Sequence, residues 1–286
     1  MLKQRIITAL VLLAILLPAL FYRSAPGAIP IPFACVMLVL IAAAGWEWGK
    51  LNGYGQGVAL LFGAETFALC VLSWALGLLD RPLPIVWTVA GACWVLGAAA
   101  LLRVGVPGWP RIPKPLRVVG GLLALWVAWL AAVQARMVGV NFLLSILLLV
   151  WMADICAYFA GRAFGLKFTR NKLAPAISPG KSWEGVWGGV IGVVVLAVLW
   201  VWADASTQAS VSSLYTRLVA RAWWLLPIGV LFVVAMSVVG DLVESLIKRS
   251  AGAKDSSNLL PGHGGVLDRV DALLPTLPIA MMLAFS

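Results

Sequence analysis

Charged residues are scarce in this sequence. Only 11% of the 286 residues are charged, whereas 63% are hydrophobic and the mean hydropathy is +1.01. Soluble globular domains carry about 25% charged residues. The composition therefore excludes a soluble fold and predicts an integral membrane protein.

Residues that bind zinc or form disulfides are also few. The sequence has one histidine and four cysteines, and the cysteines lie singly within apolar runs without a C-x-x-C spacing. This pattern is typical of buried small hydrophobic residues rather than of zinc ligands or disulfide partners. We find no soluble domain, no low-complexity linker and no clear internal repeat.

Apolar runs of about 16 to 24 residues, in contrast, recur along the whole chain, and about 20 helical residues cross a membrane. The first run follows Lys3 and Arg5, a pattern that also fits a signal peptide, but eight further runs favour an uncleaved first helix. We therefore predict an all-α, polytopic membrane protein with about nine transmembrane helices. The runs cover residues 6–22, 28–44, 58–79, 84–102, 118–135, 140–160, 185–203, 225–247 and 272–286, and the last is short for a full span.

The net charge of +10 is explained by orientation in a membrane rather than by nucleic-acid binding. If the N-terminus is cytosolic and nine helices alternate, 16 of the 21 Lys and Arg residues fall on cytosolic segments and five on the other side. Basic residues concentrate in cytosolic loops of membrane proteins. This topology places the loops 161–184 and 248–271 in the cytosol.

The acidic residues divide the chain into two parts. Seven of the eleven acids gather around the two loops, and residues 1–135 carry many Pro and Gly breaks but few charges. We predict that residues 1–135 form a scaffold of transmembrane helices and that residues 136–286 form the catalytic region. The seven acids are Asp154, Glu184, Asp241, Glu244, Asp255, Asp268 and Asp271.

Asp154 and Asp241 lie deep within their predicted helices. Each is seven or eight residues from the basic end of its run, about 10–12 Å along a helix. A charge at such depth is costly, which makes these carboxylates functional candidates. An internal ion pair is the alternative, for example Glu244 with Lys248 at i,i+4, but neither aspartate has a basic residue at helical spacing within the membrane.

The first loop contains the stretch "ISPGKSWEG" at residues 177–185. The spacing of its glycines does not match a P-loop. Ser182 is a plausible N-cap of the next helix, with Glu184 in the first turn. A helix N-terminus beside Lys181 suits a phosphate. Taken alone, the loop is explained equally well by a helix cap and a lysine that only sets the orientation in the membrane.

The second loop combines bases, glycines and acids. Lys248, Arg249 and Lys254 offer charge for phosphates, and the glycines around His263 let the backbone approach a ligand closely. Asp268 and Asp271 share a face if a helix has begun there. Acids for a divalent metal and bases for phosphate are typical of nucleotide phosphoryl or nucleotidyl transfer, whereas the simpler alternative is a solvated charged loop.

These residues resemble the signature of the phosphatidate cytidylyltransferases, also called CDP-diacylglycerol synthases. The resemblance covers residues 150–271, including "DICAYFAGRAFG" and "NKLAPAISPGKSWEG", and departs at Gly180, where the family more usually has a polar or basic residue. The signature residues are Ser245, Ile247, Lys248, Arg249, Lys254, Asp255, Ser257, Leu260, Pro261, His263, Gly264, Gly265, Val266, Asp268, Arg269, Val270 and Asp271.

The resemblance implies an inner-membrane enzyme that converts CTP and phosphatidate to CDP-diacylglycerol and pyrophosphate with Mg²⁺, as one ion or two. Metal ligands are expected at Asp241 and Asp268, with Asp154 as a further candidate. Catalytic roles are expected for Asp241, Asp268, Lys248 and His263, although a phosphate monoester is already anionic and needs no general base. Substrate contacts are expected from Lys181, Ser182, Lys248, Arg249, Lys254, Asp255, Gly264, Gly265, Arg269 and Asp271.

Two other functions remain open at this point. A CTP-dependent lipid kinase would direct a lipid hydroxyl to the γ-phosphorus, and an anion transporter would use a broken-helix site near the membrane centre. Clustering of acids and bases at one membrane face disfavours the transporter. The expected partners are CTP, phosphatidate and membrane lipid, without nucleic acid, and a homodimer is an open alternative to a monomer.

Overall fold

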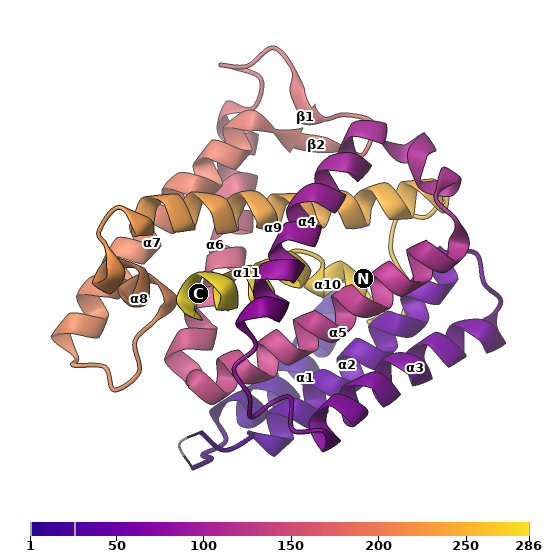
Figure 1. The fold of residues 1–286 in the computed structure, drawn as a ribbon. Helices are drawn as coiled ribbons and strands as arrows, with labels where there is room; N and C mark the ends of the chain where they lie inside the picture. The colour runs from indigo at the N-terminus through magenta and orange to yellow at the C-terminus, as the bar shows by residue number, and fades with distance from the viewer. Residues whose placement is uncertain (1, 26, 286) are drawn as a thin grey trace.

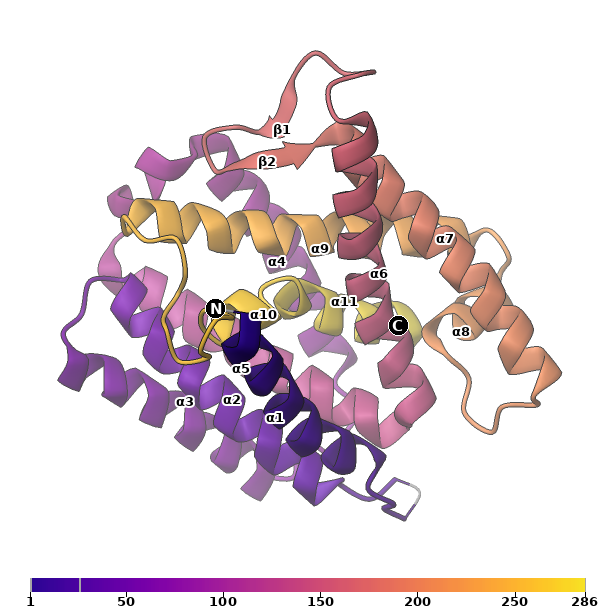
Figure 2. The same cartoon turned by 180° about the vertical axis from the view of Figure 1, so that it is seen from behind.

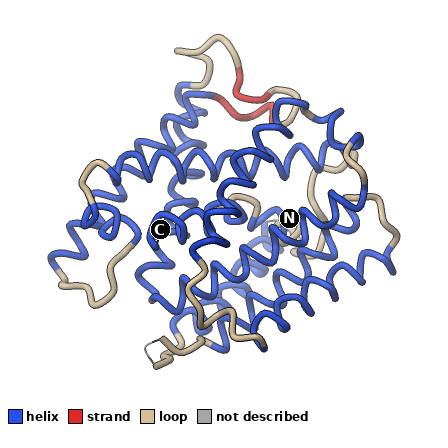
Figure 3. The backbone as a smooth tube through the Cα atoms, viewed as in Figure 1, coloured by secondary structure: helices blue, strands red, loops and turns tan. Residues whose placement is uncertain are grey.

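The computed structural model describes residues 2–25 and 27–285, and helices dominate it (Figures 1 and 3). Within these residues, eight helices are long and apolar enough to cross a membrane, which confirms the first eight predicted runs and makes the chain a multi-pass membrane protein. They are α1 (Leu2–Phe21), α2 (Ile31–Leu51), α3 (Gln56–Ala75), α4 (Pro84–Val104), α5 (Lys114–Val138), α6 (Val140–Phe164), α7 (Trp183–Ser206) and α9 (Leu225–Ser250).

The ninth predicted run forms a short buried helix. Helix α11 (Leu273–Phe285) has 13 residues, about 20 Å of helix, which is less than the hydrocarbon thickness of about 30 Å. It packs against α4, α5 and α9, and Ile279 and Ala280 are fully buried. The hydropathy of this run therefore reflects burial among other helices.

Shorter elements connect the long helices. They are the 3₁₀ helix η1 (Val106–Arg111), the helices α8 (Leu214–Arg221) and α10 (Leu267–Val270), and the strands β1 (Lys172–Ala174) and β2 (Ser178–Ser182). The strands pair antiparallel, with Lys172 opposite Ser182. This small hairpin lies in the loop between α6 and α7 and leaves the protein all-α in class (Figure 3).

Helices α6 and α7 pack closely because small residues line their contact. A Cβ added at Gly185 would lie 2.9 Å from the Ala157 carbonyl oxygen, and one added at Gly189 would lie 2.9 Å from that of Ala153. Small residues four apart let two membrane helices approach backbone to backbone. This contact holds β2 and the start of α7 beside α6.

The five segments predicted to be cytosolic meet at one end of the helices. They are the segment before residue 6 and residues 45–57, 103–117, 161–184 and 248–271. Thr8 Oγ1 donates to the Pro261 carbonyl at 3.0 Å, Ser250 Oγ to that of Val106 at 2.9 Å, and Trp48 Nε1 to that of Arg117 at 3.1 Å. Arg249 on α9 lies 3.4 Å from the Ile177 carbonyl in the hairpin loop. Figure 2 shows α1 beside α2, and the first turns of α1 lie against residues 261 and 262 of the loop before α10.

The opposite end is held by a separate set of hydrogen bonds. Arg136 donates to the Leu20 and Tyr22 carbonyls at 2.6 and 2.7 Å, and Asn141 donates to the Val211 carbonyl at 2.7 Å. The predicted grouping of loops into two faces is therefore present in the fold.

Candidate active site

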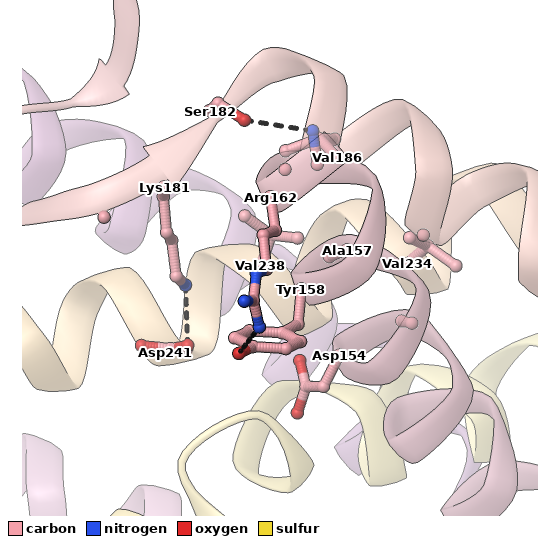
Figure 4. Close-up of a pocket in the computed structure, with 15 residues that line it drawn as sticks. Asp154, Ala157, Tyr158, Arg162, Lys181, Ser182, Val186, Val234, Val238 and Asp241 are labelled. Atoms are coloured by element: carbon pink, nitrogen blue, oxygen red, sulfur yellow. Dashed lines mark hydrogen bonds and ion pairs between the residues drawn. The ribbon is translucent and has the colours of Figure 1, made fainter. Parts of the chain in front are cut away.

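A cavity of about 430 Å³ lies between α6, α7 and α9, beside the end of β2 (Figure 4). Much of its wall is apolar, with Val186, Val234 and Val238 among the lining residues. Ionisable groups project from three separate elements at its polar side. The polar and ionisable lining residues are Asp154, Tyr158, Arg162, Lys181, Ser182 and Asp241.

An ion pair joins two of these elements. Lys181 Nζ, at the end of β2, lies 2.6 Å from Asp241 Oδ2 on α9 (Figure 4). The Ser182 hydroxyl accepts a hydrogen bond from the Gly185 N–H at 3.2 Å, which confirms Ser182 as the N-cap of α7 and fixes the adjacent lysine. The internal ion pair considered as an alternative for Asp241 is therefore present, although its basic partner lies 60 residues earlier in the sequence and not at helical spacing on α9.

A second ionic cluster lies further along α9. Lys248 Nζ contacts Glu244 Oε2 and Asp268 Oδ1, both at 2.5 Å. The i,i+4 pair of Glu244 and Lys248, considered from spacing alone, is therefore present. Because Asp268 belongs to α10, Lys248 also joins α9 to the rest of the loop 248–271, the signature loop.

Asp268 is surrounded by hydrogen-bond donors. Its Oδ2 accepts from the backbone N–H groups of Ser256 and Gly265 at 2.8 and 2.7 Å, and from the Ser256 hydroxyl at 2.9 Å. Burial alone would raise the pKa of Asp268, but the hydrogen bonds from Lys248, Gly265 and Ser256 together hold that pKa below its usual range. Asp268 is therefore held as a carboxylate at neutral pH.

Asp271 links the two ionic clusters electrostatically. Burial and then the charge of Asp241 raise the pKa of Asp271 above its usual range, and the charge of Asp154 adds to the effect. The side chains of three aspartates from α6, α9 and the end of α10 thus lie close enough to influence one another. The repulsion among these carboxylates would be relieved by positive charge nearby.

The whole chain is similar to one known protein family. The family model described as "Cytidylyltransferase family" matches residues 3–286. The chain belongs to the cytidylyltransferase family. It is therefore a membrane nucleotidyltransferase, and the match extends the resemblance found at residues 150–271 to the N-terminal half.

Curated relatives of this cytidylyltransferase family member share its full length. It is 40% identical over 294 residues to the phosphatidate cytidylyltransferase of Pseudomonas aeruginosa, covering 100% of this chain and 98% of that protein. It is 34% identical over 298 residues to that of Haemophilus influenzae, covering 97% and 96%. The corresponding protein of Brucella suis is 36% identical over 276 residues, covering 96% and 89%.

Among the other predicted site residues, four are exposed and His263 is partly buried. Arg249, Lys254, Asp255 and Arg269 are exposed around the loop. His263 is partly buried, and its Nδ1 atom has no hydrogen-bond partner. The four exposed residues stay predicted substrate contacts, and His263 stays a predicted catalytic residue.

Two predicted glycine contacts serve the shape of the loop itself. Gly264 has a φ of +83°, and a Cβ there would lie 2.7 Å from Asp268 Oδ2. A Cβ at Gly265 would collide with the Ser256 hydroxyl and the Glu47 carboxylate. The glycines allow the backbone to approach these acids, and their contact with a substrate stays a prediction.

Three residues near the site were not selected from the sequence. Tyr158 and Arg162 follow Asp154 at i+4 and i+8, so helical spacing alone could have found them. Arg162 Nη1 lies 3.4 Å from the Tyr158 hydroxyl (Figure 4). Glu47, fully buried on α2, contacts the signature loop. Its position next to an apolar run is the sequence signal that marks it.

The acids can be tested for their fit to a divalent metal, which nucleotidyl transfer generally requires. No group of three or more His, Cys, Asp or Glu side chains in the described parts of the chain is arranged as a ready metal site. The donor chemistry nevertheless fits, because carboxylate oxygens are the ligands that Mg²⁺ prefers. Asp241 and Asp268 each hold a lysine ammonium, so both already stabilise a cation.

Proposed function

We propose that this chain transfers the cytidylyl group of CTP to phosphatidate at the cavity and the adjoining signature loop. A phosphate oxygen of phosphatidate attacks the α-phosphorus of CTP, the bond to the β-phosphate oxygen breaks, and pyrophosphate leaves. The products are CDP-diacylglycerol and pyrophosphate. The observation that carries the proposal is the similarity over the full length to phosphatidate cytidylyltransferases.

The cavity suits the lipid substrate in its chemistry. Its apolar wall of Val186, Val234 and Val238 fits acyl chains, and Lys181 and Arg162 can meet a phosphate at the polar side. The cavity is lined by helices that span the membrane, so its lipid would enter from the bilayer. We place the phosphatidate head group here.

The signature loop suits the nucleotide. Arg249, Lys254 and Arg269 are exposed in the same loop as Lys248 and Asp268, and they can neutralise the charge of a triphosphate. Two anionic substrates then meet between the cavity and the loop. Substrate phosphate is already ionised, so these residues bind and orient it without removing a proton.

A divalent metal, which we take to be Mg²⁺ as one ion or two, would be held by Asp241 and Asp268, with Asp154 and Asp271 close by. When bound, the metal supplies positive charge that stabilises the phosphates during transfer. Asp154 makes no hydrogen bond or ion pair with any described residue and lines the cavity, so its oxygens are available. Lys181 and Lys248 hold the two aspartates in position.

The proposal places the protein in the bacterial inner membrane with both loops in the cytosol. The segments that carry 16 of the 21 basic residues meet at one end of the fold, which supports this orientation. CTP is a cytosolic nucleotide, so its site must face the cytosol. Residues 136–286 carry the reacting groups, and residues 1–135 support them.

The proposal is tested with purified protein in detergent, supplied with phosphatidate, CTP and Mg²⁺. We expect a new nucleotide-bearing lipid and one equivalent of pyrophosphate, and no product when EDTA is present. Activity that is unaffected by EDTA, or a lipid product that lacks the nucleotide, contradicts the proposal. Heat-inactivated protein is the control.

A further inference from the structure

Glu47 on α2 is the most deeply buried acid near the site, and it lies outside the lining of the cavity. Its side chain has no exposed surface. Among the ion pairs of the described residues, none includes Glu47. Its charge is instead stabilised by hydrogen bonds from the signature loop, which lies more than 200 residues later in the sequence.

Four donors converge on the two carboxylate oxygens of Glu47. Oε1 accepts from the Ser257 hydroxyl at 2.5 Å and the Val266 N–H at 2.9 Å. Oε2 accepts from the Ser256 hydroxyl at 3.2 Å and the Leu267 N–H at 2.7 Å. A carboxylate that is paired in this way fixes the positions of all four donors.

The same contacts continue to the reacting groups. Leu267 precedes Asp268, and the Ser256 hydroxyl lies between Glu47 and Asp268, at 3.2 and 2.9 Å from them. A hydroxyl has one hydrogen, so Ser256 donates to one carboxylate at a time, and the Ser256 N–H also donates to Asp268. Displacing Glu47 would therefore move Asp268 and, through it, Lys248.

The loop sequence is matched to this contact. Gly265 lies against both Glu47 and Ser256, and any Cβ there would collide with them. The loop has little regular structure of its own between residues 251 and 266, where only an isolated bridge joins Leu260 to Gly264. Its conformation thus depends on contacts such as those of Glu47.

We propose that Glu47 is a positioning residue for the transfer reaction: its carboxylate holds both ends of the segment 256–267 and so places Asp268 for catalysis. This inference rests on the proposed function for its kinetic consequences, but the ordering of the loop can be measured without any substrate. It also gives the N-terminal half a direct part in building the site.

The test replaces Glu47 by Gln, which keeps the size but removes the charge and turns an amide NH₂ toward two of the donors. Hydrogen–deuterium exchange is measured on the purified full-length protein, followed by initial rates over a range of phosphatidate concentrations. We expect the amides of 256–267 to exchange at least tenfold faster while the long helices keep their protection. We expect kcat to fall about 30-fold, equivalent to about 2 kcal/mol, with the KM for phosphatidate within about twofold of the unaltered value.

Further variants provide matched comparisons. Glu47→Asp keeps the charge on a shorter side chain and should restore part of kcat. Glu65→Gln, which changes an exposed acid on the neighbouring helix α3, should leave both readouts unchanged. If Glu47→Gln does not accumulate, Ser257→Ala removes one of the four donors and should give a smaller change of the same kind.

Three results overturn the proposal. The first is unchanged exchange in segment 256–267, and the second is a kcat within threefold of the unaltered protein. The third is loss of protection spread evenly over all helices, because Glu47 would then stabilise only the fold. If the unaltered protein transfers no cytidylyl group, the proposed function fails, and the exchange measurement still decides whether Glu47 orders the loop.

Discussion

Replacing Asp241 by Asn separates a catalytic role of this acid from a structural one. The substitution removes the charge that would hold a divalent metal, and it leaves the Lys181 ammonium without its partner at 2.6 Å. If Asp241 acts in catalysis, we expect turnover to fall by about 10³-fold, a loss of roughly 4 kcal/mol of transition-state stabilisation.

The cost in stability should be small because the ion pair is partly exposed to the cavity. The side chains of Lys181 and Asp241 keep 26% and 30% of their surface exposed. Removing one partner of a fully buried pair costs about 3–5 kcal/mol, whereas an exposed pair contributes about 1 kcal/mol or less. We therefore expect Asp241→Asn to melt within about 4 °C of the unaltered protein.

The assay measures turnover and thermal stability on the same purified preparations, with Lys181→Met and the double variant as controls. If the pair were only structural, the double variant would lack a stranded charge and would recover both activity and stability. If both residues act on substrate or metal, the double variant stays inactive. An active Asp241→Asn protein, or an activity loss that merely follows unfolding, would refute the catalytic role.

Three further predictions follow from the same geometry. Asp268→Asn should also reduce transfer by about 10³-fold, because it removes the charge beside Lys248; a rate within tenfold of the unaltered protein contradicts this. Gly264→Ala should reduce activity at least tenfold, because the φ of Gly264 is +83° and the new Cβ would clash with the Asp268 carboxylate. A fully active Ala variant would show that the loop adapts and would contradict this prediction. Single cysteines can be placed at the exposed positions Asn171, Asn258 and Thr207 in a cysteine-free background. Those at Asn171 and Asn258 should react with an impermeant thiol reagent only after cells are permeabilised, whereas the one at Thr207 should react in intact cells. The reverse labelling pattern would contradict the predicted topology.

The sequence was sufficient to predict the parts of the fold that depend on hydropathy. Eight spans coincide with helices because membrane-crossing segments need continuous apolar length. The ninth run was counted among the transmembrane helices, although it is short for a full span, because an apolar helix buried among other helices has the same composition as one in lipid. Length was the distinguishing signal, since α11 has only 13 residues.

The candidate site was predictable as a set of residues but less so as a set of contacts. Spacing within one helix revealed the pair of Glu244 and Lys248. It could not reveal the pair of Lys181 and Asp241, because helical periodicity carries no information about which separate segments meet. The position of Glu47 next to an apolar run marks it as a candidate, but its partners beyond residue 255 could not be predicted for the same reason.

The most direct test of the proposed reaction follows both ends of the nucleotide. Purified protein is incubated with phosphatidate, Mg²⁺ and CTP that carries one label in the cytidine and another on the γ-phosphate. We predict that the cytidine label enters the lipid and that the γ-label is released in pyrophosphate, in equal amounts. A lipid that carries the γ-label without cytidine would identify a lipid kinase and would contradict cytidylyl transfer.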